Sequence, residues 1–198
     1  IISFPTTAAG TAFYVCPELS AGQAGIFLHF GQRIHKPEGL NHYSKTIHPY
    51  MTTDLLVIGS GIAGLTFAIK AAKALPDKEI LVLTKAASAE ETNTNYAQGG
   101  VAGVWDFEKD SFDKHIEDTL IAGDGLCDPR AVEVVVKEGP DRIREIIGYG
   151  TRFDKNEGGD YNLGREGGHS EFRILHHKDV TGKEIERALI AEAARHKN

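Results

Sequence analysis

The chain has 198 residues, a formal net charge of −6, 41% hydrophobic residues and 25% charged residues. This composition is typical of a packed globular domain, and the negative charge argues against a general surface for nucleic acid or anionic membranes. The two cysteines, Cys16 and Cys127, form no C-x-x-C pair and cannot supply a cysteine-based metal or iron–sulfur site. We therefore expect no metal, no nucleic-acid partner and no membrane partner, and a reducing compartment, the cytoplasm.

Residues 1–50 differ from the rest of the chain. They show no clear helix or strand period, and the only methionine is Met51. They lack the apolar core and cleavage site of a secretory signal, and the arginine-rich character of an organelle transit peptide is weak. We expect residues 1–50 to be an upstream extension outside the fold, and residues 51–198 to hold the folded part. A genuine extension that packs on the domain is the alternative.

Residues 54–85 carry the clearest pattern, which predicts a strand, a glycine turn, a helix and a second strand. Leu55–Ile58 is short, apolar and partly β-branched, as is typical of a strand buried on both faces. The helix is expected to run to about Leu75, and Ile80–Leu83 is expected to form the second strand. The segment is therefore predicted to be one βαβ unit.

The turn between the first strand and the helix has the spacing G-x-G-x-x-G, formed by Gly59, Gly61 and Gly64. In dinucleotide-binding folds the first glycine allows a tight turn, the second lets the backbone approach a pyrophosphate, and the third lets the helix sit close to the strand. Within a complete βαβ unit this spacing favours nucleotide binding over an ordinary glycine turn. The second strand ends in Thr84 and Lys85, where a plain NAD site would carry an acidic residue.

Two further helices are predicted from their capping signals. Asp110 or Ser111 is expected to cap a helix that ends at Ala122. Near the end of the chain, Thr181-x-x-Glu184 has the spacing of a capping box for a last helix.

A third helix is predicted to begin at Pro129, after the capping residue Asp128. Its apolar face is expected to bury Val132, Val135 and Val136. Pro140 is expected to break or kink this helix, because proline lacks the N–H that the helix interior requires.

Several motifs occur together in one order along the chain, and their combination is far more specific than the glycine turn alone. They are Gly-Ser-Gly-Ile-Ala-Gly at 59–64, Thr-Asn-Tyr-Ala-Gln-Gly-Gly at 94–100, Glu-Asp-Thr-Leu-Ile-Ala-Gly at 117–123, Arg-Glu-Gly-Gly-His-Ser at 165–170, Arg-Ile-Leu-His at 173–176 and Asp-Val-Thr-Gly at 179–182. With these motifs, residues 53–197 closely resemble the L-aspartate oxidases, which belong to the fumarate reductase/succinate dehydrogenase flavoprotein family.

The resemblance implies an α/β fold, namely a partial and incomplete Rossmann-like FAD-binding domain with inserted helices. It also implies FAD as the cofactor. Relatives in membrane complexes carry a flavin-linked histidine where this chain has Asn93, so the resemblance implies non-covalent FAD. The implied cofactor-binding residues are Gly59, Ser60, Gly61, Ile62, Ala63, Gly64, Lys85, Asn93, Thr94, Asn95, Tyr96, Ala97, Gln98, Gly99 and Gly100.

Glu166 is the residue that discriminates within this family, because succinate dehydrogenases and fumarate reductases carry an aromatic residue at its position. A carboxylate there suits a substrate with an ammonium group, since opposite charges attract strongly in a partly desolvated pocket. Glu166 is therefore the candidate for orienting the substrate, and L-aspartate the favoured substrate. The alternative is a surface ion pair with Arg165 or Arg173. His169 is a further candidate for the pocket, and His177 is expected to be exposed.

The resemblance implies oxidation of L-aspartate to iminoaspartate, the first step of NAD biosynthesis from aspartate. Oxygen or fumarate would accept the electrons, and quinolinate synthase would receive the product. In this family the catalytic arginine and the capping domain lie later than Asn198, so we expect this chain to be an N-terminal fragment that is inactive alone. The alternatives are a flavoprotein subunit of a fumarate reductase or succinate dehydrogenase, a nucleotide-binding module without catalysis, and an NAD-dependent dehydrogenase.

Overall fold

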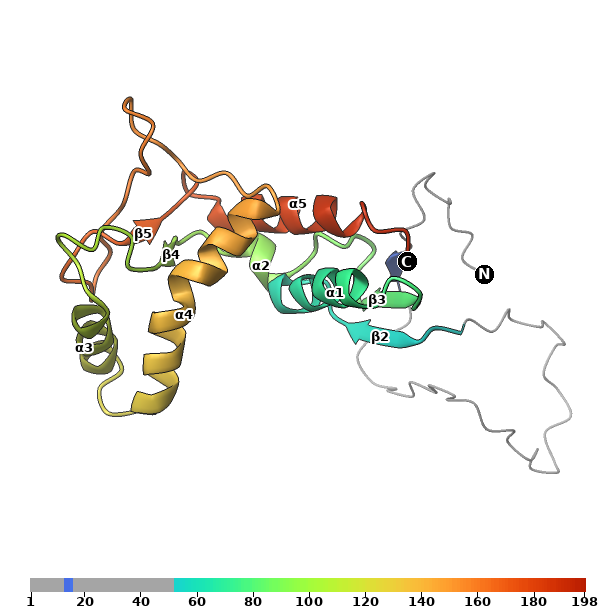
Figure 1. The fold of residues 1–198 in the computed structure, drawn as a ribbon, viewed down its shortest axis with the longest axis horizontal. Helices are drawn as coiled ribbons and strands as arrows, with labels where there is room; N and C mark the ends of the chain where they lie inside the picture. Colours follow the sequence, from blue (N-terminus) through green and yellow to red (C-terminus); the bar gives the residue numbers. More distant parts are fainter. Residues whose placement is uncertain (1–12, 16–51) are drawn as a thin grey trace, which may run out of the picture.

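The computed structural model describes residues 13–15 and 52–198 (Figure 1). The elements in chain order are β1 (Phe13–Val15), β2 (Leu55–Ile58), α1 (Ile62–Ala74), β3 (Ile80–Thr84), α2 (Asn93–Tyr96), β4 (Val101–Ala102), α3 (Phe112–Ala122), α4 (Pro129–Gly148), β5 (Ile174–Leu175) and α5 (Thr181–Ala193). Among the helices of the described part, none has both the length and the hydropathy needed to cross a membrane.

The predicted βαβ unit is present. β2 and β3 are parallel, with Leu55 opposite Ile80, and α1 connects them. Ala68 of α1 packs against Val57 and Val82, one from each strand, because the helix must bury its apolar face on the sheet. The helix ends at Ala74 and the second strand reaches Thr84, each one residue from the expected boundary.

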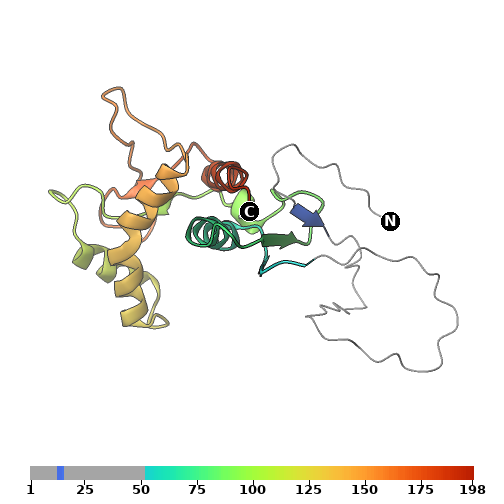
Figure 2. The ribbon, with the colours of Figure 1, turned by 45° about the vertical axis from the view of Figure 1, so that its right-hand side comes forward.

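The other edge of β3 pairs with β1, which is also parallel to it, so β3 is the central strand of three (Figure 2). These three residues belong to the segment 1–50 that was expected to lie outside the fold, and the structure places them in the sheet. The free edge of β3 offers unpaired N–H and C=O groups, which a further strand satisfies. The rest of that expectation concerns residues that lie outside the described part of the chain.

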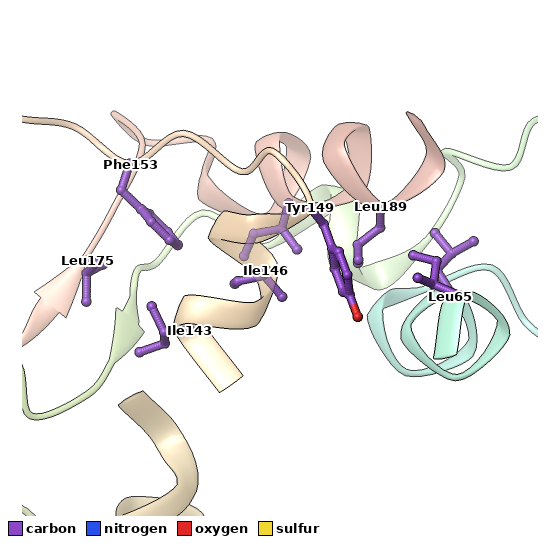
Figure 3. Packing of buried hydrophobic residues seen from close by; sticks show 9 residues of the cluster. Leu65, Ile143, Ile146, Tyr149, Phe153, Leu175 and Leu189 are labelled. Atoms are coloured by element: carbon purple, nitrogen blue, oxygen red, sulfur yellow. The ribbon is translucent and has the colours of Figure 1, made fainter. Parts of the chain in front are cut away.

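A larger core joins α1, α4 and α5 to β5, and Figure 3 shows its side chains directed toward one another. In Figure 1, α5 lies along α1 and crosses one end of α4, while α3 lies beside the other half of α4. The buried members of this core are Leu65, Ile69, Ile143, Ile146, Tyr149, Phe153, Leu175, Ile185 and Leu189. The core fixes the position of the segments that follow β3 relative to the glycine turn.

The structure excludes a break of α4 at Pro140, one of the two outcomes predicted for this proline, and it corrects the burial predicted for one valine. The helix continues through Pro140, and its first half is anchored by Val132 and Val136 while its second half is anchored by Ile143. Burial on both sides of the proline compensates for the single missing hydrogen bond. Val135 is 69% exposed, so the prediction that it is buried was wrong.

The predicted cap of α3 is confirmed, because the Ser111 side chain accepts a hydrogen bond from the backbone N–H of Lys114. The predicted capping box of α5 is wrong. The hydroxyl of Thr181 accepts from the backbone N–H of His177 instead. The carbonyl of Ala97, from the segment after α2, accepts the N–H of Gly182 at 2.9 Å. A tertiary contact thus replaces the local cap.

Glu186 of α5 is fully buried, and neither of its carboxylate oxygens has a hydrogen-bond partner within the described residues. Burial raises its pKa from 4.5 to about 7, against the opposing effect of the nearby Thr92 hydroxyl. A raised pKa means that the folded state keeps a proton that the unfolded state has lost, so this contribution to stability is complete below pH 4.5 and is lost as the pH rises to about 7.

Replacement of Glu186 by Gln is therefore expected to remove a pH dependence of about 2–3 kcal/mol in the free energy of unfolding between pH 5 and pH 8. Denaturant unfolding of both proteins at the two pH values measures it. The exposed Glu157→Gln variant is the control and should keep the wild-type slope. A Glu186→Gln variant with the wild-type pH dependence would contradict this prediction.

Candidate functional site

The turn after β2 has the geometry that its glycines predict. Gly59 has a φ of +106°, in the region that favours glycine. A Cβ added to Gly64 would lie 2.0 Å from the carbonyl oxygen of Gly59, and no side chain fits in that space. The third glycine thus lets α1 start directly against the end of β2.

The N-terminus of α1 is open to an anion. Its N-cap residue, Gly61, offers no side-chain cap, and its first turn contains no acidic residue. The N–H of Ile62 donates to Thr94 Oγ1 at 3.0 Å. The following N–H groups have no partner within the helix, and the helix dipole favours negative charge at this end.

A cavity of about 630 Å³ lies beside this helix start. The ends of β2 and β3 and the segment around α2 form its walls, which matches the rule that ligands bind at the carboxyl ends of parallel strands. Its lining residues are Ile58, Gly59, Ser60, Gly61, Leu83, Thr84, Lys85, Glu91, Thr92, Asn93, Thr94 and Tyr96. The volume lies within the roughly 300–1,000 Å³ typical of sites for small molecules and cofactors.

Seven of the predicted cofactor-binding residues line this cavity, namely Gly59, Ser60, Gly61, Lys85, Asn93, Thr94 and Tyr96. The other predicted residues do not line it: Ile62, Ala63, Gly64, Asn95, Ala97, Gln98, Gly99 and Gly100. Ile62 lines a neighbouring cavity beside α4, and Asn95 lines one beside α5. A cofactor role for these residues stays a prediction.

Two contacts shape the walls of the cavity. Ser60 is buried, and its hydroxyl donates to the carbonyl of Ala89 at 2.8 Å while it lies 3.1 Å from Thr84 Oγ1. The side-chain hydroxyls of Ser60 and Thr84 thus make contacts within the protein. The hydroxyl of Tyr96, which also lines the cavity, donates to the carboxylate of Glu91, and this hydrogen bond raises the pKa of Tyr96.

Glu166 lies against the glycine stretch of Gly99 and Gly100. The N–H of Gly100 donates to Glu166 Oε1 at 3.3 Å, and Gly99 lies close to the same carboxylate. The antiparallel pair β4 and β5 brings the two segments together, because β4 follows Gly100 and β5 ends the loop that carries Glu166. Within the described residues Glu166 makes no ion pair with Arg165 or Arg173.

The histidine predictions have different outcomes. His169 lies on the same loop as Glu166, but its Nδ1 lies 3.2 Å from Nη1 of Arg173. Arginine only donates, so His169 accepts through Nδ1. His177 is half-buried, and its backbone N–H donates to Thr181, so the prediction that it is exposed was wrong.

The sequence reasoning missed a buried ion cluster beneath the loop. Arg173 is fully buried, and it donates to both carboxylate oxygens of Asp110, at 2.8 and 2.7 Å. Asp118 binds the same guanidinium through Nη1. The pairs are separated by 63 and 55 residues, and no local pattern in the sequence connects them. Thr92 was missed as well, although a threonine three residues before Asn95 is a cap signal.

The chain was compared with known proteins. Residues 54–197 match the family model described as FAD binding domain. An L-aspartate oxidase of Nicotiana tabacum, named as chloroplastic, is 52% identical over 145 residues, which are 73% of this chain and 22% of that protein. The L-aspartate oxidase of Yersinia pestis is 45% identical over 150 residues, which are 74% of this chain and 27% of that protein.

Among solved structures, a variant of the E. coli quinol fumarate reductase has a TM-score of 0.68 at 31% identity, covering 73% of this chain and 24% of that chain. The chain therefore spans about a quarter of the length of these relatives. The glycine turn, the uncapped helix start and the cavity beside Lys85 fit the diphosphate of a dinucleotide. With the match over residues 54–197, these features show that the chain belongs to the family of FAD binding domains.

Proposed function

We propose that this chain is the cofactor-binding part of an enzyme that oxidises L-aspartate to iminoaspartate with non-covalent FAD. The observation that carries the proposal is the carboxylate of Glu166 beside Gly99 and Gly100, at the segment that the family resemblance assigns to the flavin. The high identity to proteins named L-aspartate oxidase supports the same substrate.

The glycine turn has the first task in this proposal. The backbone from Gly59 to Gly61 and the start of α1 hold the diphosphate, where unpaired N–H groups and the helix dipole stabilise negative charge. Lys85 is exposed at the cavity and adds a positive charge. Asn93 at the cavity wall carries an amide that forms no covalent bond to the cofactor. When bound, FAD supplies the acceptor for the hydride that leaves the substrate Cα.

Glu166 has the second task, which is to select and orient the substrate. Its Oε1 accepts the Gly100 N–H, and its side chain is exposed, so the carboxylate can accept from an ammonium group. An ionised carboxylate recognises ammonium through charge-assisted hydrogen bonds. The ammonium end of L-aspartate would thereby be held next to Gly99 and Gly100.

Several finer points belong to the same proposal. The βαβ unit supports a partial Rossmann-like domain over residues 51–198. We propose oxygen or fumarate as the acceptor and quinolinate synthase as the enzyme that takes the product. The cytoplasm stays a prediction, and the plant relatives are named as chloroplastic. Because the chain spans about a quarter of its relatives, the activity is proposed for the full-length protein that includes this chain.

A second candidate is a flavoprotein subunit like that of fumarate reductase, which the likeness to the E. coli structure favours. That function needs no ammonium site. Asn93 and Glu166 argue against it, since the family resemblance places a flavin-linked histidine and an aromatic residue at these positions in such subunits.

The test is anaerobic flavin reduction in the full-length protein, followed by the loss of flavin absorbance. We expect L-aspartate to reduce the flavin and succinate, which has the same two carboxylates without the ammonium group, to leave it oxidised. Reduction by succinate and not by L-aspartate would replace the proposal with the second candidate.

A further inference from the structure

The loop that carries Glu166 is closed at its base. Gly164 and Ile174 exchange backbone hydrogen bonds of 2.8 and 3.0 Å. Inside the loop, the N–H of His169 donates to the carbonyl of Glu166 at 3.2 Å, and Gly168 has a φ of +85°. This is a β-turn with glycine at its third position, where a positive φ is required. The turn fixes the direction in which Glu166 leaves the backbone.

Asp118 of α3 binds the chain just beyond this turn. Its Oδ2 accepts from the backbone N–H of Ser170 at 2.8 Å, from the Ser170 hydroxyl at 2.9 Å and from Nη1 of Arg173 at 2.5 Å. A single carboxylate oxygen thus holds two residues of the loop. The nearby pair of Lys114 and Glu171 also joins α3 to the loop, but it is solvent-exposed and contributes little.

Arg173 makes this anchor rigid. Its side chain has no exposed surface, and Asp110 binds it through both carboxylate oxygens. Burial raises the pKa of Asp118, but hydrogen bonds from Ser170 and Arg173 outweigh burial and hold the pKa at about 2. The Asp118 carboxylate is therefore charged throughout the pH range of ordinary assays. The single guanidinium of Arg173 binds both carboxylates, so removal of either one disturbs the buried cluster.

We propose that Asp118 is a positioning residue for substrate selection, which through Ser170 and Arg173 holds the turn so that Glu166 meets the ammonium group of the substrate. The inference rests on the proposed function, because it takes Glu166 as the ammonium site. Displacement of a binding group by about 1 Å is enough to impair a site. Loss of the anchor therefore weakens recognition of the ammonium group and leaves a dicarboxylate without ammonium less affected.

The first experiment compares Asp118→Asn with Glu117→Gln in the full-length protein. Glu117 is exposed on the same helix, so its change removes the same charge without touching the loop. We expect Asp118→Asn to raise the KM for L-aspartate about tenfold and to change the KM for fumarate less than about twofold. Glu117→Gln is expected to match the wild type on both substrates. Equal changes for the two substrates in Asp118→Asn would overturn the proposal.

A double variant distinguishes positioning from a general structural role. If Asp118 acts through Glu166, the double variant with Asp118→Asn and Glu166→Gln has the same KM for L-aspartate as Glu166→Gln alone. If the two substitutions each raise the KM for L-aspartate by their own factor in the double variant, the positioning role is overturned and the proposed function remains intact. An unchanged KM in Glu166→Gln alone would overturn the ammonium site itself.

Ser170→Ala decides the matter if Asp118→Asn does not fold. It removes one of the three hydrogen bonds to Asp118 and leaves the buried ion cluster intact. We expect it to raise the KM for L-aspartate about two- to fivefold, with no further effect in the Glu166→Gln background. An unchanged KM for L-aspartate in Ser170→Ala would contradict the anchor.

Discussion

Replacement of Glu166 by Gln is expected to lower kcat/KM for L-aspartate by about 10- to 100-fold, because a hydrogen bond to a charged group contributes about 1.5–3 kcal/mol. Glutamine keeps the shape of the side chain and its contact with the Gly100 N–H, and it loses the negative charge that attracts ammonium. Fumarate has no ammonium group, so its use is expected to change much less. Steady-state rates with each substrate measure the two effects.

Two further variants test whether the loss in Glu166→Gln comes from the missing charge at this position. Glu166→Asp retains the charge on a shorter side chain and is expected to fall between the wild type and Glu166→Gln. Glu157→Gln removes an exposed carboxylate from the hairpin bridged by Lys155 and Tyr161 and is expected to leave both substrates unaffected. Equal losses with L-aspartate and fumarate in Glu166→Gln would argue against an ammonium site.

Replacement of Gly64 by Ala is expected to destabilise the fold by about 3 kcal/mol and to abolish tight FAD binding. The added Cβ would lie 2.0 Å from the carbonyl oxygen of Gly59, so α1 has to move away from β2. Overpacking of a well-packed site costs about 1–3 kcal/mol, and a clash with backbone belongs at the upper end of this range. Thermal unfolding and the flavin retained after gel filtration measure the two losses.

Gly148→Ala is the matched control for this change. Gly148 is the last residue of α4, and a Cβ there meets nothing within 4 Å. Alanine is favoured over glycine in helices by up to about 1 kcal/mol, so this variant is expected to be as stable as the wild type or more stable. A Gly64→Ala protein that keeps its flavin and its unfolding temperature would contradict the close packing of α1 on β2.

The sequence predicted those parts of the fold whose signals are local. The βαβ unit follows from one apolar run, three glycines and a second apolar run, and each of these acts within a few residues. The Ser111 cap is local as well. The family resemblance assigned Gly100 to the cofactor and Glu166 to the substrate, but no property of either segment alone indicates that they meet.

Two of the differences, at Pro140 and at Thr181, have a common physical cause, which is that tertiary packing outweighed a local signal. Pro140 did not break α4, which was one of its two predicted effects, because apolar residues on both sides of it are buried in the core. Thr181 did not cap α5, because the carbonyl of Ala97 accepts the helix N–H. The cluster around Arg173 could not be predicted, because its partners are distant in the chain and each is an unremarkable charged residue in its own segment.

The short pairing of β4 with β5 has a consequence for how the protein acquires its site during synthesis. It brings the N–H of Gly100 to the carboxylate of Glu166, which lies 66 residues later in the chain. Contacts between residues so far apart in the sequence form late in folding. The glycine turn at residues 59–64 leaves the ribosome long before β5 does. A nascent chain therefore exposes its glycine turn first, and the carboxylate of Glu166 can reach Gly100 only after Leu175 has emerged.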